Sequence, residues 1–326
     1  MSDINGDRWQ HLAQAKITAR ESLKNLPLEQ AKEQSDPLGF RFGLWQPDNI
    51  CHLETNFEPS FKPVSNKKTF IELRNIFLKL KELDLDIVLV GGQAVNYWAN
   101  YYQRRCPQLN QYIPYSSEDI DFFGGRLEAQ IAHQALGGEI NIAKDFSPSP
   151  NSGVLLVPYQ NSSLRIDFLA SVYGLSDADI IKYAVPIVGI ELMLGADFKV
   201  ISPLLCLEGK LKSLMGLPQQ GRQDLKHLQM SILIAREFIA EIVQDGSVRL
   251  GLNLIERLAR NSISDAGLQA WYQHGIDTID AIPLNIIEET KDSKLRKFIE
   301  VRYPQMVTEV QEKRKRYQAL MERFNK

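Results

Sequence analysis

The stretch SEDIDFF, residues 117–123, places two carboxylates one residue apart in a segment that otherwise has the composition of a β-strand. In an extended chain, Asp119 and Asp121 lie on one face, and Ile120 and Phe122 lie on the other. Two neighbouring carboxylates repel each other unless a cation lies between them, and their hard oxygen atoms favour a divalent cation such as Mg²⁺. The pattern therefore predicts a metal site on the open face of a strand. The alternative is a solvated strand edge.

A third carboxylate, Asp167, lies on a later segment with the same period of two. Leu164, Ile166 and Phe168 are expected to share the buried face of that segment. Asp167 then lies on the open face together with Arg165. The alternative is an aspartate that is solvated or paired with the arginine.

Length and composition indicate a globular protein, since the chain has 326 residues and 44% of them are hydrophobic. The net charge of -2 gives no overall attraction to nucleic acid or to an anionic membrane, so such affinity needs a local patch. The three cysteines, Cys51, Cys106 and Cys206, are too few and too far apart for a disulfide framework. The N-terminus lacks an apolar signal core, and no run approaches the ~20 apolar residues of a membrane span. We expect a cytoplasmic protein without a membrane partner.

Helical and extended patterns predict an α+β fold in three parts. Residues 1–65 form an N-terminal extension, helical at first and then irregular, where glycine, proline and aromatic residues gather. Residues 66–201 form a core that contains both helices and strands. Residues 202–326 form a C-terminal helical domain that shows no strand pattern.

The expected elements follow from hydrophobic period and from turn residues. The predicted helices of the core are 69–83, 93–106, 127–136 and 178–183, and its predicted strands are 86–90, 117–123, 153–157, 163–169, 187–194 and 198–201. Ser202 as N-cap and Pro203 in the first turn begin the helical part. Its predicted helices are 204–215, 222–243, 251–260, 265–279 and 293–324.

The order of these motifs resembles the DNA polymerase beta-like nucleotidyltransferase superfamily. The motifs are a glycine pair after a buried strand, S-x-D-h-D on a second strand and h-D-h on a third, where h is hydrophobic. The later blocks SP at 202–203, KLKSL at 210–214 and RQDL at 222–225 are similar to the AbiEii-type family, whose members are bacterial nucleotidyltransferases of toxin–antitoxin and abortive-infection systems. The resemblance covers about residues 71–233. It implies a nucleotidyltransferase-type mixed sheet, flanked by helices, as the catalytic core.

The resemblance implies a two-metal site in which Asp119, Asp121 and Asp167 are both metal ligands and catalytic residues. Mg²⁺ is the expected cofactor. Asp119 and Asp121 would hold the metal at the phosphates, and Asp167 would share the second metal and help to deprotonate the attacking hydroxyl.

The implied nucleotide-binding residues are Gly91, Gly92, Gln93, Ser117, Lys210 and Asp224. A glycine pair lets the backbone turn closely against a triphosphate, and the start of a helix presents N–H groups to an anion. Lys210 would contact phosphate, Asp224 would support the same corner, and Lys212 is the alternative to Lys210.

Three features depart from the family pattern. Gln93 follows Gly92 where the superfamily usually has a serine hydroxyl, so Gln93 or the backbone must bind phosphate. The interval from Gly92 to Asp119 is longer than usual and contains Arg104 and Arg105, which we expect in a lid or an acceptor contact. His227 stands where the family often has a second aspartate, and it receives no catalytic role.

The expected function is metal-dependent transfer of a nucleoside monophosphate from an NTP, such as ATP, to an acceptor hydroxyl. The acceptor is tRNA in some relatives, and the resemblance implies a toxin-like component with a cognate antitoxin. Two alternatives remain open: nucleotidylation of a small molecule or a protein side chain, and a non-catalytic nucleotide-binding scaffold. A costly cluster of three carboxylates argues against the scaffold.

A basic segment at the end of the chain bears on the acceptor. Residues 291–326 contain eleven basic and five acidic residues, a net charge of +6, with KRKR at 313–316. Such a segment is either a solvated helix face or a source of phosphate affinity for RNA.

Overall fold

The computed structural model describes residues 67–83, 85–144, 149–160, 162–186 and 199–324. Lys67–Lys326 forms one compact unit. The predicted N-terminal extension and the strand expected at 187–194 lie outside the described residues. The division of the chain near residue 201 stays a prediction.

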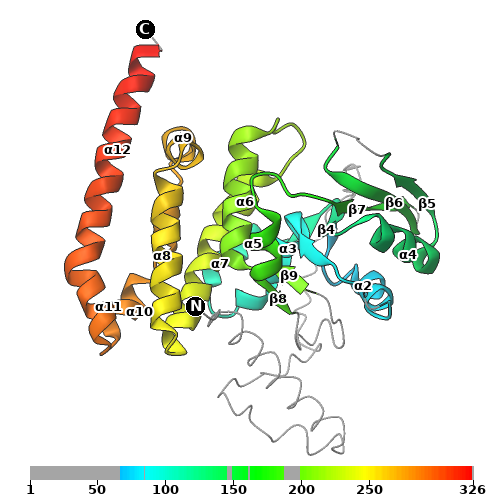
Figure 1. Ribbon diagram of the computed structural model, residues 1–326, viewed down its shortest axis with the longest axis horizontal. Helices are drawn as coiled ribbons and strands as arrows, with labels where there is room; N and C mark the ends of the chain where they lie inside the picture. The colour runs from blue at the N-terminus through cyan, green and yellow to red at the C-terminus, as the bar shows by residue number, and fades with distance from the viewer. Residues whose placement is uncertain (1–66, 84, 145–148, 161, 187–198, 325–326) are drawn as a thin grey trace, which may run out of the picture. The chain divides into compact units, whose positions relative to one another are not determined.

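This unit contains a seven-stranded mixed sheet with helices beside it, which confirms the α+β class (Figure 1). Its strands are β2 (Val88–Val90), β4 (Asp119–Phe123), β5 (Glu139–Ile142), β6 (Asn151–Tyr159), β7 (Ser162–Leu169), β8 (Ala184–Pro186) and β9 (Lys199–Ile201). Their order is β5-β6-β7-β4-β2-β9-β8. The β2–β9 and β4–β7 pairs are parallel, and the other neighbours are antiparallel. A separate antiparallel pair joins β1 (Lys68–Thr69) to β3 (Ser116–Ser117).

The register of the central strands brings the predicted carboxylates together. Asp121 on β4 lies opposite Asp167 on β7, and Asp119 lies opposite Arg165. On the other side of β4, Val90 at the end of β2 pairs with Asp121. The turn that follows β2 is therefore placed directly beside the carboxylates.

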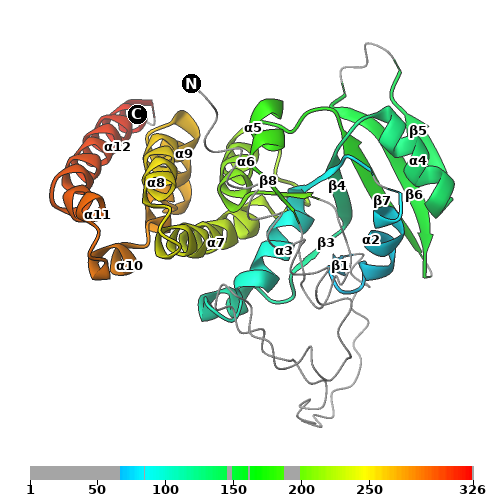
Figure 2. The ribbon, with the colours of Figure 1, turned by 60° about the horizontal axis from the view of Figure 1, so that its bottom comes forward.

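The opposite face of these strands belongs to the hydrophobic core, as the period of two predicted. Ile120, Phe122, Ile166 and Phe168 have no exposed surface. The rings of Phe122 and Phe168 are 5.8 Å apart. The helix α4 (Arg126–Leu136) packs against β5, β6 and β7, and the helix α2 (Arg74–Lys81) packs against α4 (Figure 2). With this face buried, the acidic side chains point to the other one.

Three helices pack together near the C-terminal end of β2. The helix α3 (Gly91–Tyr102) follows β2 directly, and it packs against α6 (Pro203–Gly216) and α7 (Asp224–Gln244). The indole Nε1 of Trp98 on α3 donates a hydrogen bond of 2.8 Å to the carbonyl oxygen of Ile201. Ser202 occupies the N-cap position of α6, although its side chain makes no capping hydrogen bond.

The long interval between Gly92 and Asp119 contains the 3-10 helix η1 (Pro107–Tyr112), which packs against α7. Next to it, Arg105 pairs with Glu241 of α7 at 3.5 Å. A lid or acceptor role for this segment stays a prediction.

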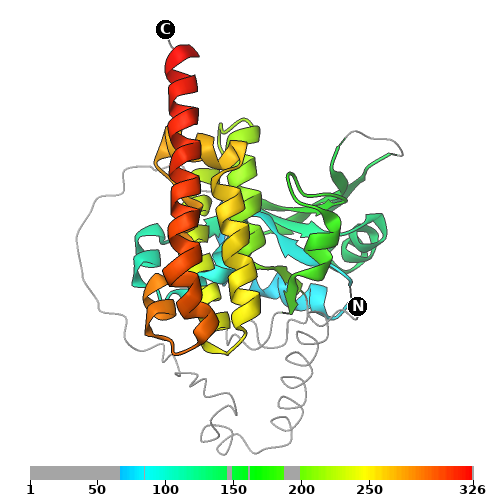
Figure 3. The ribbon, with the colours of Figure 1, turned by 60° about the vertical axis from the view of Figure 1, so that its left-hand side comes forward.

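From Pro203 to Phe324, the regular elements of the described chain are all helical. After α7 they are α8 (Val248–Ser262), α9 (Asp265–His274), η3 (Thr278–Ala281), α10 (Leu284–Glu289), α11 (Ser293–Lys297), η4 (Phe298–Arg302) and α12 (Tyr303–Phe324). The helices α8 and α12 run beside each other (Figure 3). In the described part of the chain, no helix has the length and apolar character needed to cross a membrane.

A buried ionic network fixes α6, which carries Lys210, to α8. Glu208 of α6 is 3% exposed and accepts hydrogen bonds from Arg257 of α8 at 2.5 and 2.6 Å. Arg257 also donates to Asp179 of α5 (Asp177–Lys182) at 2.8 Å. Because a buried charge is tolerated only when it is paired, this network favours one placement of the two helices.

Candidate metal and nucleotide site

Three carboxylates from two adjacent strands meet at the centre of the sheet. Asp119 and Asp121 come from β4 and Asp167 from β7, and one ligand atom of each lies within 4.8 Å of the others. Asp167 is buried, and the other two are partly buried. Such a set of hard oxygen atoms is the ligand type that Mg²⁺ prefers. The three residues form a candidate metal site.

The electrostatics of the cluster also fit a cation. Burial, followed by the charge of Asp119, raises the pKa of Asp121 to about 8, although Lys210 acts in the opposite direction. Burial likewise raises the pKa of Asp167, against the hydrogen bond from Arg165. A divalent cation would offset this repulsion and let both groups ionise.

The guanidinium of Arg165 offsets part of the negative charge of Asp167. Its Nε lies 3.0 Å from both carboxylate oxygens of Asp167, so the predicted arginine pairing is present. The Arg165 side chain is about half exposed, whereas that of Asp167 is 8% exposed. Asp167 would therefore share its oxygens between the guanidinium and a bound cation.

The glycine pair fits tightly against the site. Gly91 has a φ of +65°, and a Cβ at this position would lie 1.9 Å from Oδ2 of Asp121. A Cβ on Gly92 would lie 2.6 Å from Oγ of Ser117. Both the backbone conformation and the lack of space require glycine at position 91. The sequence predicts that the backbone of this glycine pair lies close to a triphosphate. In the structure, the group that lies close to Gly91 is the carboxylate of Asp121.

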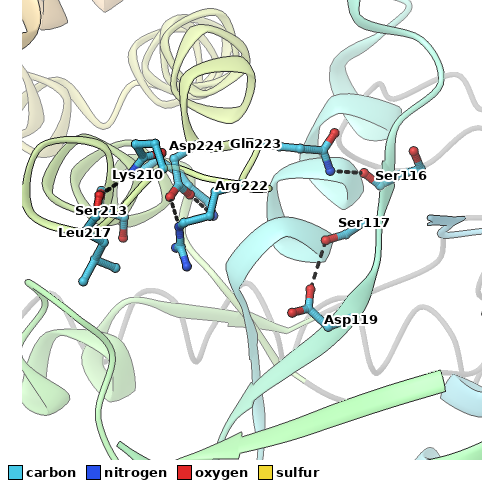
Figure 4. A network of polar contacts seen from close by, with 10 residues as sticks. Ser116, Ser117, Asp119, Lys210, Ser213, Leu217, Arg222, Gln223 and Asp224 are labelled. Atoms are coloured by element: carbon cyan, nitrogen blue, oxygen red, sulfur yellow. Dashed lines mark hydrogen bonds and ion pairs between the residues drawn. The ribbon is translucent and has the colours of Figure 1, made fainter. Parts of the chain in front are cut away.

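Ser117 lies within the site, and the amide of Gln93 is occupied elsewhere. The Ser117 hydroxyl donates to Oδ1 of Asp119 at 3.2 Å (Figure 4). Gln93 has no exposed surface, its Nε2 donates to the carbonyl oxygen of Lys68, and its Oε1 accepts from Asn96. Contact of either residue with a nucleotide stays a prediction.

The predicted Lys210–Asp224 corner is formed (Figure 4). Nζ of Lys210 lies 2.9 Å from Oδ1 of Asp224, and Nε of Arg222 lies 2.5 Å from Oδ2. Burial acts to raise the pKa of Asp224, but the two cations outweigh it and hold that pKa below its usual value. At the start of α7, Nε2 of Gln223 donates to the carbonyl oxygen of Ser116 at 3.1 Å, which ties this corner to β3.

Arg222 is a functional candidate that received no role from the sequence. Both Lys210 and Arg222 are close enough to Asp121 to lower its pKa, so two cations lie near the carboxylate cluster. The available signal was the position of Arg222, two residues before Asp224. Lys212 points elsewhere, since its Nζ donates to the carbonyl oxygen of Gly174.

Fold and site together define an α+β protein with a three-carboxylate candidate metal site beside a cationic corner. No protein-family model matches the chain, and no curated protein matches it. Among solved structures, the crystal structure of JHP933 from Helicobacter pylori is similar at 14% sequence identity, over 78% of this chain and 96% of that chain, with a TM-score of 0.33. Membership of the AbiEii-type family stays a prediction.

Proposed function

We propose that the protein transfers a nucleoside monophosphate from an NTP to an acceptor hydroxyl in a Mg²⁺-dependent reaction. The observation that supports it is the cluster of Asp119, Asp121 and Asp167, with the cations Lys210 and Arg222 near it. Carboxylates suit divalent metal ions, and the two cations suit phosphate oxygens. A site that offers both, beside the start of a helix, is matched to a metal-bound triphosphate.

Each residue has a task in this proposal. Bound Mg²⁺ would supply neutralisation of phosphate charge and alignment of the leaving pyrophosphate. Asp119 and Asp121 hold it, and Lys210 and Arg222 bind phosphate oxygens. Asp167 lies on β7, next to Asp121 of β4, and accepts the proton of the attacking hydroxyl.

The proposed acceptor is RNA, with tRNA as the first candidate. The support is the basic segment 291–326, in which Lys313, Lys315 and Arg316 are exposed. A toxin-like role with a cognate antitoxin follows from the family resemblance, and it belongs to the same proposal.

The test is a label-transfer experiment with each α-³²P-labelled NTP and total cellular extract. The proposal expects Mg²⁺-dependent label in the RNA fraction. Label in protein or in a small molecule would keep the chemistry and replace the acceptor. Tight NTP binding without label in any fraction would contradict transfer and support the non-catalytic scaffold.

A further inference from the structure

His227 lies on α7, three residues after Asp224, with its ring against the turn between β2 and α3. The residue is 2% exposed. A Cβ on Gly92 would lie 3.0 Å from Cε1 of His227 and 2.6 Å from Oγ of Ser117. Cε1 is the ring carbon between Nδ1 and Nε2, so the edge of the ring that carries both nitrogen atoms lies next to Gly92 at the start of α3.

Nε2 of His227 is a buried polar atom. Among the described residues, Nε2 of His227 has no hydrogen-bond partner. Leaving a buried donor or acceptor unpaired costs free energy, and nearly all such groups in folded proteins are paired. An unpaired nitrogen at a helix start therefore points to a ligand that completes it.

The charge state of the ring defines the type of contact. Burial, followed by the charge of Lys210, holds the pKa of His227 well below its usual value, although Asp224 acts in the opposite direction. A neutral imidazole carries one N–H donor and adds no cation beside Lys210. The N–H groups at the start of α3 are donors too, so this turn suits an anion with several oxygen atoms.

We infer that Nε2–H of His227 donates a hydrogen bond to a phosphate oxygen of a nucleotide bound at the Gly91–Gly92 turn. The inference rests on the proposed function and adds a contact to that site. It makes His227 a ligand-binding residue for the triphosphate, beside the cations Lys210 and Arg222.

Nitrogen NMR of the histidine side chains tests this contact directly. The chain has five histidines, so ¹⁵N-histidine spectra are simple, and His227→Asn assigns the resonance. With Mg²⁺ and inorganic tripolyphosphate as the probe, we expect the Nε2 signal of His227 to shift as the hydrogen bond forms, while His133 and His274 stay unchanged. An unchanged His227 signal, with tripolyphosphate binding shown by calorimetry, would overturn the inference alone. Failure of the parent protein to bind tripolyphosphate or any NTP would overturn the proposed function as well.

Two variants separate hydrogen bonding from packing. His227→Leu removes the donor and is expected to weaken tripolyphosphate binding about tenfold. His227→Gln keeps an amide donor near the same position and is expected to restore most of that loss. The exposed His274→Leu is the matched control and should bind as the parent does. Equal weakening by leucine and glutamine would assign His227 to packing. If the leucine variant does not fold, the affinity of the glutamine variant for tripolyphosphate and the shift of the His227 NMR signal still test the hydrogen bond.

Discussion

Asp121 is the carboxylate of the site whose pKa is raised to about 8 by burial and by the charge of Asp119. Its pKa of about 8 in the folded protein lies above the usual value of 3.8, so the metal-free folded protein keeps a proton that the unfolded chain has lost. The stability of the metal-free protein should then fall as pH rises from about 4 to about 8. Asp121→Asn has no such proton, so its melting temperature in EDTA should gain on the parent across this window. The exposed Asp86→Asn is the control and should show no gain. If the melting temperatures of the parent and of Asp121→Asn changed equally with pH, the raised pKa of Asp121 would be contradicted.

Asp167 tests the division of tasks among the three carboxylates. Asp167→Asn should bind NTP with little loss and turn over slowly, because its proposed role lies at the attacking hydroxyl. Arg165→Gln breaks the same ion pair but keeps the carboxylate, so it should retain most of the turnover. Binding and turnover are measured separately by calorimetry and label transfer. Equal loss of both properties in Asp167→Asn would remove the assigned role.

Lys210 and Lys212 form a matched pair on one helix. Lys210→Ala should weaken NTP binding by roughly 1–3 kcal/mol, the scale of a charge-assisted hydrogen bond. Lys212→Ala should do much less, because Lys212 is directed to Gly174. Because Lys210 also pairs with buried Asp224, thermal melts must accompany the binding measurements. A reversed order of the two variants would shift the phosphate contact to Lys212.

At the residue scale, sequence motifs predicted the site best where strand period fixes side-chain direction. Asp119, Asp121 and Asp167 met because β4 and β7 pair in register. The partners of Gln93 and Arg222 are harder to predict from the sequence, because they depend on the tertiary fold. The amide of Gln93 donates to the carbonyl oxygen of Lys68, and Arg222 pairs with Asp224 and lowers the pKa of Asp121.

At the element scale, the turn between β2 and α3 has the clearest test. Gly91 and Gly275 share a φ of +65°, but only at Gly91 would a Cβ meet other atoms within 4 Å. Gly275→Ala should cost roughly 1–2 kcal/mol, as expected for a left-handed backbone. Gly91→Ala should cost more and should also weaken Mg²⁺ binding, because the added methyl displaces the Asp121 carboxylate. Denaturant unfolding and Mg²⁺ titration provide the measurements.

A double-mutant cycle supplies the control. In an Asp121→Ala background, Gly91→Ala should become less costly, because the displaced group is gone. If the losses in the free energy of unfolding from the two substitutions simply added, the contact between Gly91 and Asp121 would not affect stability.

Long periodic elements were predicted well, and short ones depended on tertiary contacts. The β6–β7 hairpin and α4 are present as predicted. The strand β5 was missed, since its four residues become a strand only by pairing with β6. The helix predicted at 265–279 is divided, because Gly275 adopts a left-handed conformation and ends α9.

For the molecule as a whole, the basic C-terminal segment is the place to test acceptor binding. The structure separates Arg314 from its neighbours, since it pairs with Asp277 and lies over the ring of Trp271 at 5.1 Å. The test therefore replaces Lys313, Lys315 and Arg316 by alanine and leaves Arg314 in place. We expect weaker RNA binding and a flatter dependence on salt, because fewer counterions are released, with unchanged NTP affinity. Binding equal to that of the parent at every salt concentration would remove this segment from the acceptor site.

The central claim is that the three carboxylates carry out metal-dependent nucleotidyl transfer. The most direct test compares α-³²P- and γ-³²P-labelled NTP in parallel reactions with Mg²⁺, using the parent protein, Asp119→Ala and Asp86→Ala. We expect that the acceptor receives only the α label, that the γ label appears in pyrophosphate, and that only Asp119→Ala abolishes both signals. Near-normal transfer by Asp119→Ala, or transfer of the γ label to the acceptor, would contradict it.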